Sequence, residues 1–339
     1  MSTANEATTA AAKSENIKPE QTQQMQTLNA SERFMNKVIS EFTSNIAGGL
    51  NITDHQKRLA QGYFIIIDAM LQKQERDRVT KNADNTDHKY DNPLPMTWQN
   101  VNLKDLALDV VYNVRMGLDM TQKNHIFPIP FRNKKTNKYD ITLMPGYSGK
   151  EHITMKYARE VPRAVTVELV YSTDEFTPLM KSADRPYTSY TFVVTKPFDR
   201  GKIVGGFGYI EYADPLQNKL VWMSIEDIEK RKPEKASPEF WGGTVKRKEN
   251  GQWVEVEKEG WYAEMCEKTL RRAIFSNRYI PIDPEKIDEN YLYMKKREAD
   301  YAEQQAEAEI DTMADSVVVE DIPEELPPAA PTADEDDLP

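Results

Sequence analysis

A run of basic side chains between positions 123 and 159 is the part of the sequence best suited to bind a polyanion. Only Asp140 and Glu151 oppose it in this stretch, so the local net charge is +6. Lysines on a polar turn can clamp phosphates without reading bases, whereas lysines at a strand edge also protect against aggregation. Both interpretations stay open for the residues concerned: Lys123, Arg132, Lys134, Lys135, Lys138, Lys150, Lys156 and Arg159.

A second group of cations, Lys268, Arg271 and Arg272, is spaced to share one face of a helix. This face is either a second polyanion contact or a solvated surface paired with Glu264 and Glu267. Because basic residues recur at two places, we favour nucleic-acid binding. The opposite face is apolar, with Tyr262, Cys266, Leu270, Ala273 and Ile274 able to bury there.

Aromatic residues lie among the basic ones. Phe131, Tyr139 and Tyr147 could each stack on a base at roughly 1–3 kcal/mol, or could equally belong to the core.

The other reactive residue types form no metal site or catalytic set. The single cysteine, Cys266, excludes an internal disulfide and reads as a small buried hydrophobe rather than a nucleophile. The stretch from Gly146 to Lys150 lacks the spacer and the hydroxyl of a nucleotide-binding phosphate loop. We therefore expect no cofactor, no metal and no covalent chemistry, and none of the histidines has ligand spacing: His55, His88, His125 and His152.

Helical periodicity predicts the elements that position these cations. Thr53 and Gln56 form a capping box, and Gly117 suits a left-handed helix end. Residues 80–97, which are polar and contain two prolines, are predicted as a loop. The predicted helices span residues 31–47, 53–78, 103–117, 147–159, a short turn after Ser224, and 261–276.

Alternating patterns predict strands at 125–131 and 140–144, joined by the basic turn 133–138. Pro128 and Pro130 place the first of these at a sheet edge. Strands at 165–171, 190–195, 203–212 and 219–223 then read as an antiparallel meander, and 232–259 as an inserted loop or hairpin. The expected fold class is α+β, an antiparallel β-meander and hairpin core packed with helices, with disordered ends.

Charged residues are distributed unevenly along the chain. Its 339 residues carry a net charge of −11, but residues 298–339 hold fifteen acidic and no basic side chains, so residues 1–297 carry +4. We expect a disordered segment over 1–30, a core over 31–297, and an acidic, largely disordered tail over 298–339. The N-terminus has no signal-peptide pattern, and the longest apolar run, 63–67, is too short for a membrane span. We therefore expect a soluble cytoplasmic protein.

Several motifs follow one another in a set order. Residues 111–119 end a helix in Gly-Leu-Asp, 125–131 end a strand in Pro-Phe, and 144–149 read Met-Pro-Gly-Tyr-Ser-Gly. Residues 261–272 contain Met-Cys-Glu-Lys-Thr followed by two arginines, and 174–176 add a weaker match. Over about residues 31–285 this ordered set resembles the RecT family of phage and prophage single-strand annealing recombinases.

This resemblance implies an ATP-independent protein that binds single-stranded DNA, forms rings or helical filaments and yields annealed duplex DNA, with no covalent bond changed. It implies a fold related to the single-strand annealing recombinases. The implied partners are a phage 5′-to-3′ exonuclease and host single-strand-binding protein, with no membrane, in the bacterial cytoplasm.

The expected DNA-binding residues line a basic groove shared by protomers. Ser148 and Glu267 depart from the family, which often has basic residues there. A plain single-strand-binding protein without annealing activity is the alternative, and a metal-dependent nuclease comes third. The expected set is Lys123, Arg132, Lys134, Lys135, Lys138, Tyr147, Lys150, Lys156, Lys268, Thr269, Arg271 and Arg272.

Overall fold

A computed structural model describes residues 28–44, 52–85, 91–233, 236–249 and 252–316. The chain divides into two compact units, residues 1–294 and 295–339. Among these described residues, the strands all lie in the first unit, and the helix α9 (Glu289–Ser316) continues into the second. The predicted disordered segment 1–30 lies almost entirely outside the described residues, as does the tail beyond 316.

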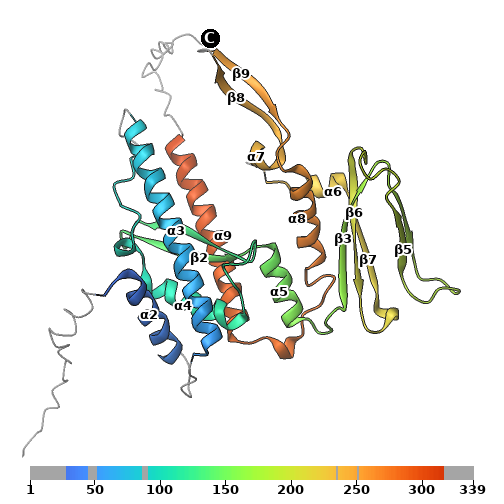
Figure 1. Ribbon diagram of the computed structural model, residues 1–339, viewed down its shortest axis with the longest axis horizontal. Coiled ribbons are helices and arrows are strands. Elements are labelled where there is room, and N and C mark those ends of the chain that lie inside the picture. Colours follow the sequence, from blue (N-terminus) through green and yellow to red (C-terminus); the bar gives the residue numbers. More distant parts are fainter. Residues whose placement is uncertain (1–27, 45–51, 86–90, 234–235, 250–251, 317–339) are drawn as a thin grey trace, which may run out of the picture. The chain divides into compact units, whose positions relative to one another are not determined.

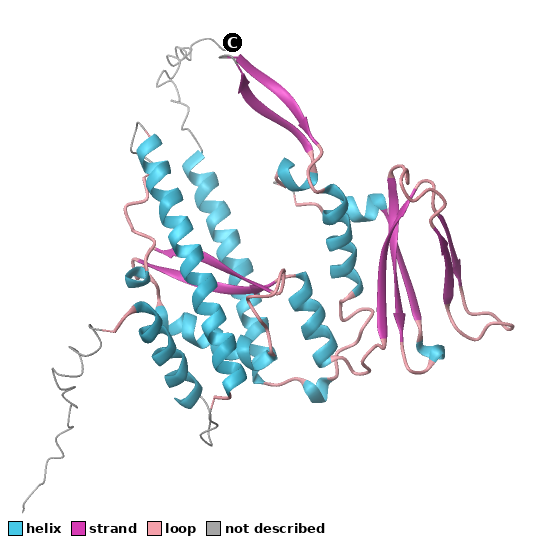
Figure 2. Cartoon of the chain, in the orientation of Figure 1, coloured by secondary structure: helices cyan, strands magenta, loops and turns pink. Residues whose placement is uncertain are grey.

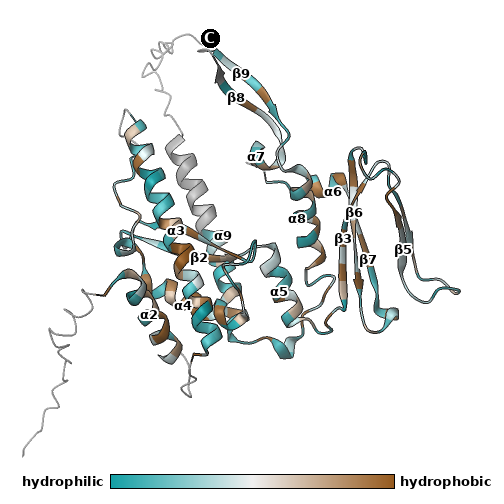
Figure 3. Ribbon diagram, viewed as in Figure 1, coloured by the Kyte–Doolittle hydropathy of each residue, from teal (hydrophilic) through white to brown (hydrophobic). Residues whose placement is uncertain are grey.

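The helices α2 (Ala30–Ser44), α3 (Asp54–Asp84) and α4 (Leu103–Met116) surround the first hydrophobic core. The predicted capping box begins α3: Gln56 N donates to Thr53 Oγ1 at 3.2 Å, and Thr53 N donates to Gln56 Oε1 at 3.0 Å. The predicted glycine ends α4, because Gly117 has a φ of 81°. Hydrophobic residues are visible on α2 and α4 in Figure 3. The loop predicted over residues 80–97 begins later than expected, because α3 continues to Asp84.

The strands β1 (Ile126–Asn133) and β2 (Lys138–Pro145) form the predicted hairpin. The hairpin is a two-stranded sheet, so both prolines of β1 lie on an edge strand, as predicted. Helix α5 (Tyr147–Tyr157) follows at once. Ile141 and Leu143 of β2, and Ile153 and Tyr157 of α5, pack into the first core, so that core carries the hairpin.

A three-stranded antiparallel sheet, ordered β3 (Ala164–Tyr171), β6 (Ile203–Glu211) and β7 (Lys219–Ser224), lies against α8 (Tyr262–Ile274) (Figure 1). The glycines of β6 permit this packing: a Cβ on Gly206 would lie 2.5 Å from Leu270, and one on Gly208 would lie 2.1 Å from Ile274. The short helix α6 (Ile225–Glu229) begins at Ser224, whose hydroxyl accepts from Asp227 N. These elements enclose the second core.

One of the four strands predicted for the antiparallel meander lies outside the sheet. Strand β5 (Ser189–Val193) does not join the three-stranded sheet but pairs with β4 (Glu175–Leu179), which the sequence did not predict. Aromatic rings connect this hairpin to the sheet: Phe176 stacks on Phe207 with centroids 4.5 Å apart, and Phe192 meets the same ring at 5.2 Å. The strands of the described chain therefore form four separate groups (Figure 2).

Within residues 232–259 lie α7 (Pro238–Trp241) and a further two-stranded hairpin, β8 (Gly243–Glu249) and β9 (Gln252–Lys258). Short 3-10 turns occur at Trp98–Asn100, Pro215–Gln217 and Pro284–Lys286. Helix α9 was not predicted, and it makes residues 298–316 helical where we expected the start of a largely disordered tail. In this second unit Lys295 and Glu298 form an ion pair at 2.7 Å.

Candidate nucleic-acid interface

The tip of the β1–β2 hairpin, residues 132–138, presents four exposed cations: Arg132, Lys134, Lys135 and Lys138. The amide side chain of Asn133 shapes the turn, because its Oδ1 accepts from Lys135 N at 3.0 Å and from Thr136 N at 3.1 Å. Its Nδ2 also donates to Asp140 at 2.8 Å. The turn is thus folded by its own polar groups, and the cations project from a defined backbone.

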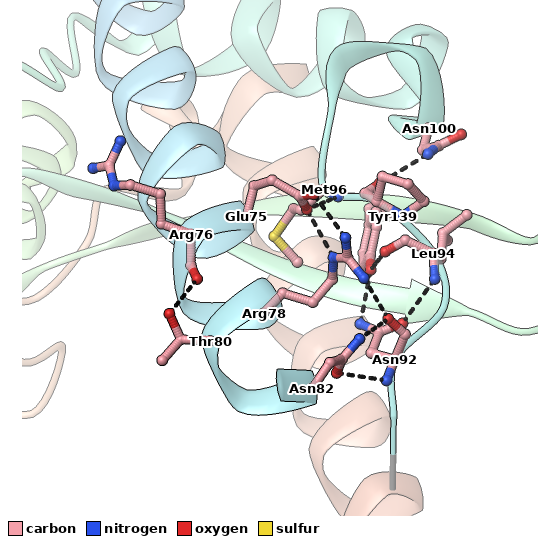
Figure 4. A network of polar contacts seen from close by, with 11 residues as sticks. Glu75, Arg76, Arg78, Thr80, Asn82, Asn92, Leu94, Met96, Asn100 and Tyr139 are labelled. Atoms are coloured by element: carbon pink, nitrogen blue, oxygen red, sulfur yellow. Dashed lines mark hydrogen bonds and ion pairs between the residues drawn. The ribbon is translucent and has the colours of Figure 1, made fainter. Parts of the chain in front are cut away.

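A polar network braces this hairpin beside its tip (Figure 4). The hydroxyl of Tyr139 on β2 donates to Leu94 O at 2.7 Å and accepts from Asn92 Nδ2 at 2.9 Å. The backbone carbonyl of Asn92 accepts from Arg78 of α3 at 2.7 Å. Arg78 also pairs with Glu75 and, chiefly through hydrogen bonding, lowers the pKa of Glu75 to about 2.

This network decides whether one of the aromatic residues is part of the core or free to stack on a base. Tyr139 is buried, with both hydroxyl contacts satisfied, so it belongs to the core and is not a stacking surface. Arg132 is exposed, and its guanidinium donates to Asn92 Oδ1 at 3.4 Å. The residues that brace the hairpin therefore reach one of the cations that it presents. Phe131 is partly buried in β1.

The Gly-Tyr-Ser-Gly motif forms the start of α5. The amides of Ser148 and Gly149 donate to the carbonyl of Asn124, which has a φ of 61°, at 3.2 and 3.4 Å. Asn124 Nδ2 also donates to the Tyr147 hydroxyl at 2.9 Å. These two amides of the first turn of α5 are thus already bonded to protein. The side chains that could contact a phosphate here include those of Lys150 and the exposed Lys123.

Helix α5 is joined to α8 by an ion pair across 120 positions of the sequence. Arg271 donates to Glu151 at 3.3 Å and to Glu267 of its own helix at 2.8 Å. Thr154 adds a hydrogen bond to Phe275 O at 3.1 Å. Cys266, Leu270, Ala273 and Ile274 are buried, which confirms the predicted apolar face of this helix.

The cations of α8 have different surroundings. Arg271 is partly buried between its two carboxylates, while Arg272 is exposed. Burial, with a smaller effect from Arg272, lowers the pKa of Lys268. The hydroxyl of Thr269 donates to Met265 O at 2.8 Å within the helix. Arg272 is therefore the residue of this face best placed to contact a phosphate.

Lys156 is exposed, but its ammonium already has partners in the protein. Its ammonium donates to Arg115 O at 3.1 Å and lies 5.6 Å from the centroid of the Tyr157 ring. Burial lowers its pKa, and the carboxylate of Asp288 acts in the opposite direction. These contacts give Lys156 a role in joining α5 to the end of α4.

The predicted site residues thus fall into two groups. One is the hairpin tip, whose strand β2 packs into the first core. The other, which we call the α5–α8 surface, comprises Tyr147, Lys150, Lys156, Lys268, Thr269, Arg271 and Arg272, with Lys123 near the start of α5. Sequence reasoning missed the residues that position both groups: Asn92, Asn124 and Glu151. Asparagine's tolerance of positive φ was the one available signal, at Asn124.

Two features are absent from the described ranges. There, no group of three or more histidine, cysteine, aspartate or glutamate side chains could hold a metal ion. In the same residues no helix has both the length and the apolar character needed to cross a membrane.

Comparisons with known proteins bear on the whole arrangement. A model of the RecT family matches residues 91–312, from before the hairpin into α9. No curated protein and no solved structure matched the chain. The match covers well over half of the sequence and includes both the hairpin tip and the α5–α8 surface. The chain therefore belongs to the RecT family, the proteins that anneal single-stranded DNA in phage recombination.

Proposed function

We propose that the protein binds single-stranded DNA through its phosphates, at the hairpin tip and the α5–α8 surface, and anneals complementary strands without ATP. The observation that carries this proposal is the hairpin tip, where four exposed cations project from a turn that is braced by buried polar contacts. Phosphate contacts of this kind fix a strand without reading its sequence.

In this mechanism homology is tested by base pairing alone. The cations neutralise phosphates, release counterions and reduce repulsion between two strands, so that unpaired bases can meet their complements. No covalent bond changes. Independence from a nucleotide is supported by the first turn of α5, where the amides of Ser148 and Gly149 donate to Asn124 O rather than face a phosphate.

The proposal extends to partners. We expect a ring or helical filament on DNA, because one chain offers only a few cations to a strand that continues past it. A phage 5′-to-3′ exonuclease would supply the single strands, and host single-strand-binding protein would be a further partner, in the bacterial cytoplasm.

The test mixes two complementary oligonucleotides with the full-length protein and follows duplex formation on a native gel, with and without ATP and over a range of salt concentrations. We expect pairing that is independent of ATP and weakens steeply with salt. A plain single-strand-binding protein would melt hairpins but fail to join the strands. Digestion of the oligonucleotides when Mg²⁺ is added would instead indicate a nuclease.

A triple lysine variant tests whether single-strand binding depends on the hairpin tip. Replacing Lys134, Lys135 and Lys138 by glutamine should reduce the salt slope of single-strand binding by about 2, since each phosphate contact contributes roughly 0.7. The matched control replaces three exposed lysines of other elements, Lys73, Lys81 and Lys104, by glutamine. Equal losses in both variants would show that net charge, not the hairpin, supports binding.

A further inference from the structure

Two aromatic residues, Phe240 of α7 and Trp261 at the start of α8, have exposed fractions of 49% and 58%. Their backbones adjoin, because Trp261 N donates to Phe240 O at 2.9 Å. Figure 1 shows α7 beside the start of α8. Exposed apolar side chains that gather at one place mark binding sites more often than scattered ones do. We call Phe240 and Trp261 the platform.

The platform is fixed by contacts within the protein. Trp241 of α7 is buried and meets the ring of Tyr262 with centroids 6.2 Å apart. Gly260, just before Trp261, has a φ of 67°, and a Cβ there would lie 2.4 Å from the backbone nitrogen of Gly242. The two chain segments therefore pass too close for a side chain, which keeps the start of α8 against the end of α7. A preorganised surface of this kind loses little conformational freedom on binding.

Trp261 begins a row of residues along the side of α8 opposite the buried Leu270. The row is spaced by four, three and four residues, which keeps its members on one side of a helix: Trp261, Met265, Lys268 and Arg272. Met265 N donates to Trp261 O at 2.9 Å, so Trp261 belongs to the first turn. At the rise of an α-helix the row is roughly 16 Å long, a length that a few nucleotides span.

The far end of this row carries two cations, Lys268 and Arg272, one turn apart. Like charges at this spacing destabilise each other, and burial together with the charge of Arg272 lowers the pKa of Lys268. Within the described residues neither side chain forms an ion pair, whereas Arg271 pairs with two carboxylates. A phosphate placed between Lys268 and Arg272 would supply the missing anion.

The charges beside the platform have the opposite sign. Within three residues of its two rings, the exposed side chains of Glu239, Glu259 and Glu264 outnumber that of Lys258. Phosphates are therefore disfavoured there, but the face of a base is uncharged and stacks on an aromatic ring. The row thus has one end suited to a base and the other suited to a phosphate.

We propose that a base of bound single-stranded DNA stacks on Trp261, with Phe240 beside it, while Lys268 and Arg272 hold a phosphate of the same strand. The inference rests on the proposed function and deepens it, by adding a base contact to the phosphate contacts. Stacking covers the face of a base and leaves its Watson–Crick edge open, so a stacked base can still meet its complement. Every base has such a face, so the contact requires no particular sequence.

The experiment measures the affinity of the full-length protein for two labelled strands by fluorescence anisotropy. One strand is an oligothymidine, and the other is an abasic strand of the same length, with the same phosphates and no bases. W261A should bind oligothymidine roughly fivefold or more weakly than wild type does, and the abasic strand equally well. W261F, which keeps an aromatic ring, should retain most of the affinity.

The matched control is W253A, because Trp253 of β9 is also exposed but lies outside the row. It should bind both strands as wild type does. Tryptophan fluorescence gives a second measurement, since stacking on a base quenches it. Quenching by oligothymidine should be smaller in W261F than in W253F, and circular dichroism checks that each variant is folded.

Three results would overturn the platform. If W261A weakens the binding of both strands equally, Trp261 supports the fold of α8 rather than a base. If W261A binds both strands as wild type does but sediments differently without DNA, the platform contacts a second copy. If wild type binds the abasic strand as tightly as oligothymidine, the phosphate contacts stand and the platform alone falls. Failure of wild type to bind either strand would instead refute the proposed function itself.

Discussion

At the scale of single residues, the Gly-Tyr-Ser-Gly motif is explained by close backbone contact. A Cβ on Gly146 would lie 2.2 Å from Asn124 O, and one on Gly149 would lie 1.9 Å from His125 O. No side chain fits at such distances. The motif therefore serves to bring the start of α5 against the strand that begins the hairpin, and so to place Tyr147 and Lys150.

We predict that Gly149→Ala will destabilise the protein by about 2–4 kcal/mol, because the added methyl group must displace buried backbone. Urea unfolding followed by circular dichroism measures this. Ser148→Ala, one position earlier on the same turn, is the control and should change stability by less than about 1 kcal/mol. Equal stability of the two variants would show that the backbone here can shift at little cost.

The residue types at the candidate site could be predicted from the sequence, but their partners could not. The spacing of Lys268, Arg271 and Arg272 identified a basic helix face, and Glu267 was foreseen as a partner of this face. The second partner, Glu151, lies 120 positions away. Local patterns contain no information on such a pair, so the difference between Arg271 and Arg272 became visible only in the fold.

At the scale of elements, that difference separates a cation that joins two helices from one that is exposed. Arg271 links α5 to α8 through two carboxylates, whereas Arg272 lies exposed one position along the same helix. Removing Arg271 would leave the partly buried Glu151 without this partner. Removing Arg272 would alter only the exposed surface.

We predict that R271Q will lower the free energy of unfolding by about 1–3 kcal/mol, while R272Q will leave it nearly unchanged. R272Q should instead weaken single-strand binding by roughly fivefold near 0.1 M salt, the effect of one lost phosphate contact. Urea unfolding and fluorescence anisotropy with a labelled oligonucleotide give the two quantities. The double variant R271Q/E151Q should regain part of the stability. If R271Q alone lost DNA binding at unchanged stability, the assigned roles would be reversed.

Elements with strong local signals were predictable. The capping box of α3, the glycine end of α4 and the polar turn of the β1–β2 hairpin are each fixed by residues close in sequence. Strand β4 was missed because it has five residues and contains Pro178, and tertiary stacking of Phe176 on Phe207 stabilises it. Helix α9 was missed because its polar sequence offered no apolar periodicity, although Tyr291 and Met294 are buried in the first core.

At the scale of the whole molecule, the net charge of residues 1–297 and the net charge of the complete chain have opposite signs. Residues 1–297 carry +4, while the complete chain carries −11. The average alone gives no sign of nucleic-acid binding, yet the chain belongs to the RecT family and presents four exposed cations at the hairpin tip. The composition of a chain is therefore informative only after it is divided by region.

The acidic residues at the end of the chain lead to a prediction about the strength of DNA binding. Residues 317–339 hold eight acidic and no basic side chains, so a chain that ends at Ser316 has a net charge of −3 instead of −11. Loss of long-range repulsion should strengthen single-strand binding several-fold at low salt, and the gain should vanish as the Debye length shortens to roughly 3 Å at 1 M salt. Anisotropy titrations at both salt concentrations measure it. A full-length variant with those eight residues changed to asparagine and glutamine should bind as the truncated chain does. If it binds like wild type while the truncated chain binds more tightly, the tail acts through its length rather than its charge.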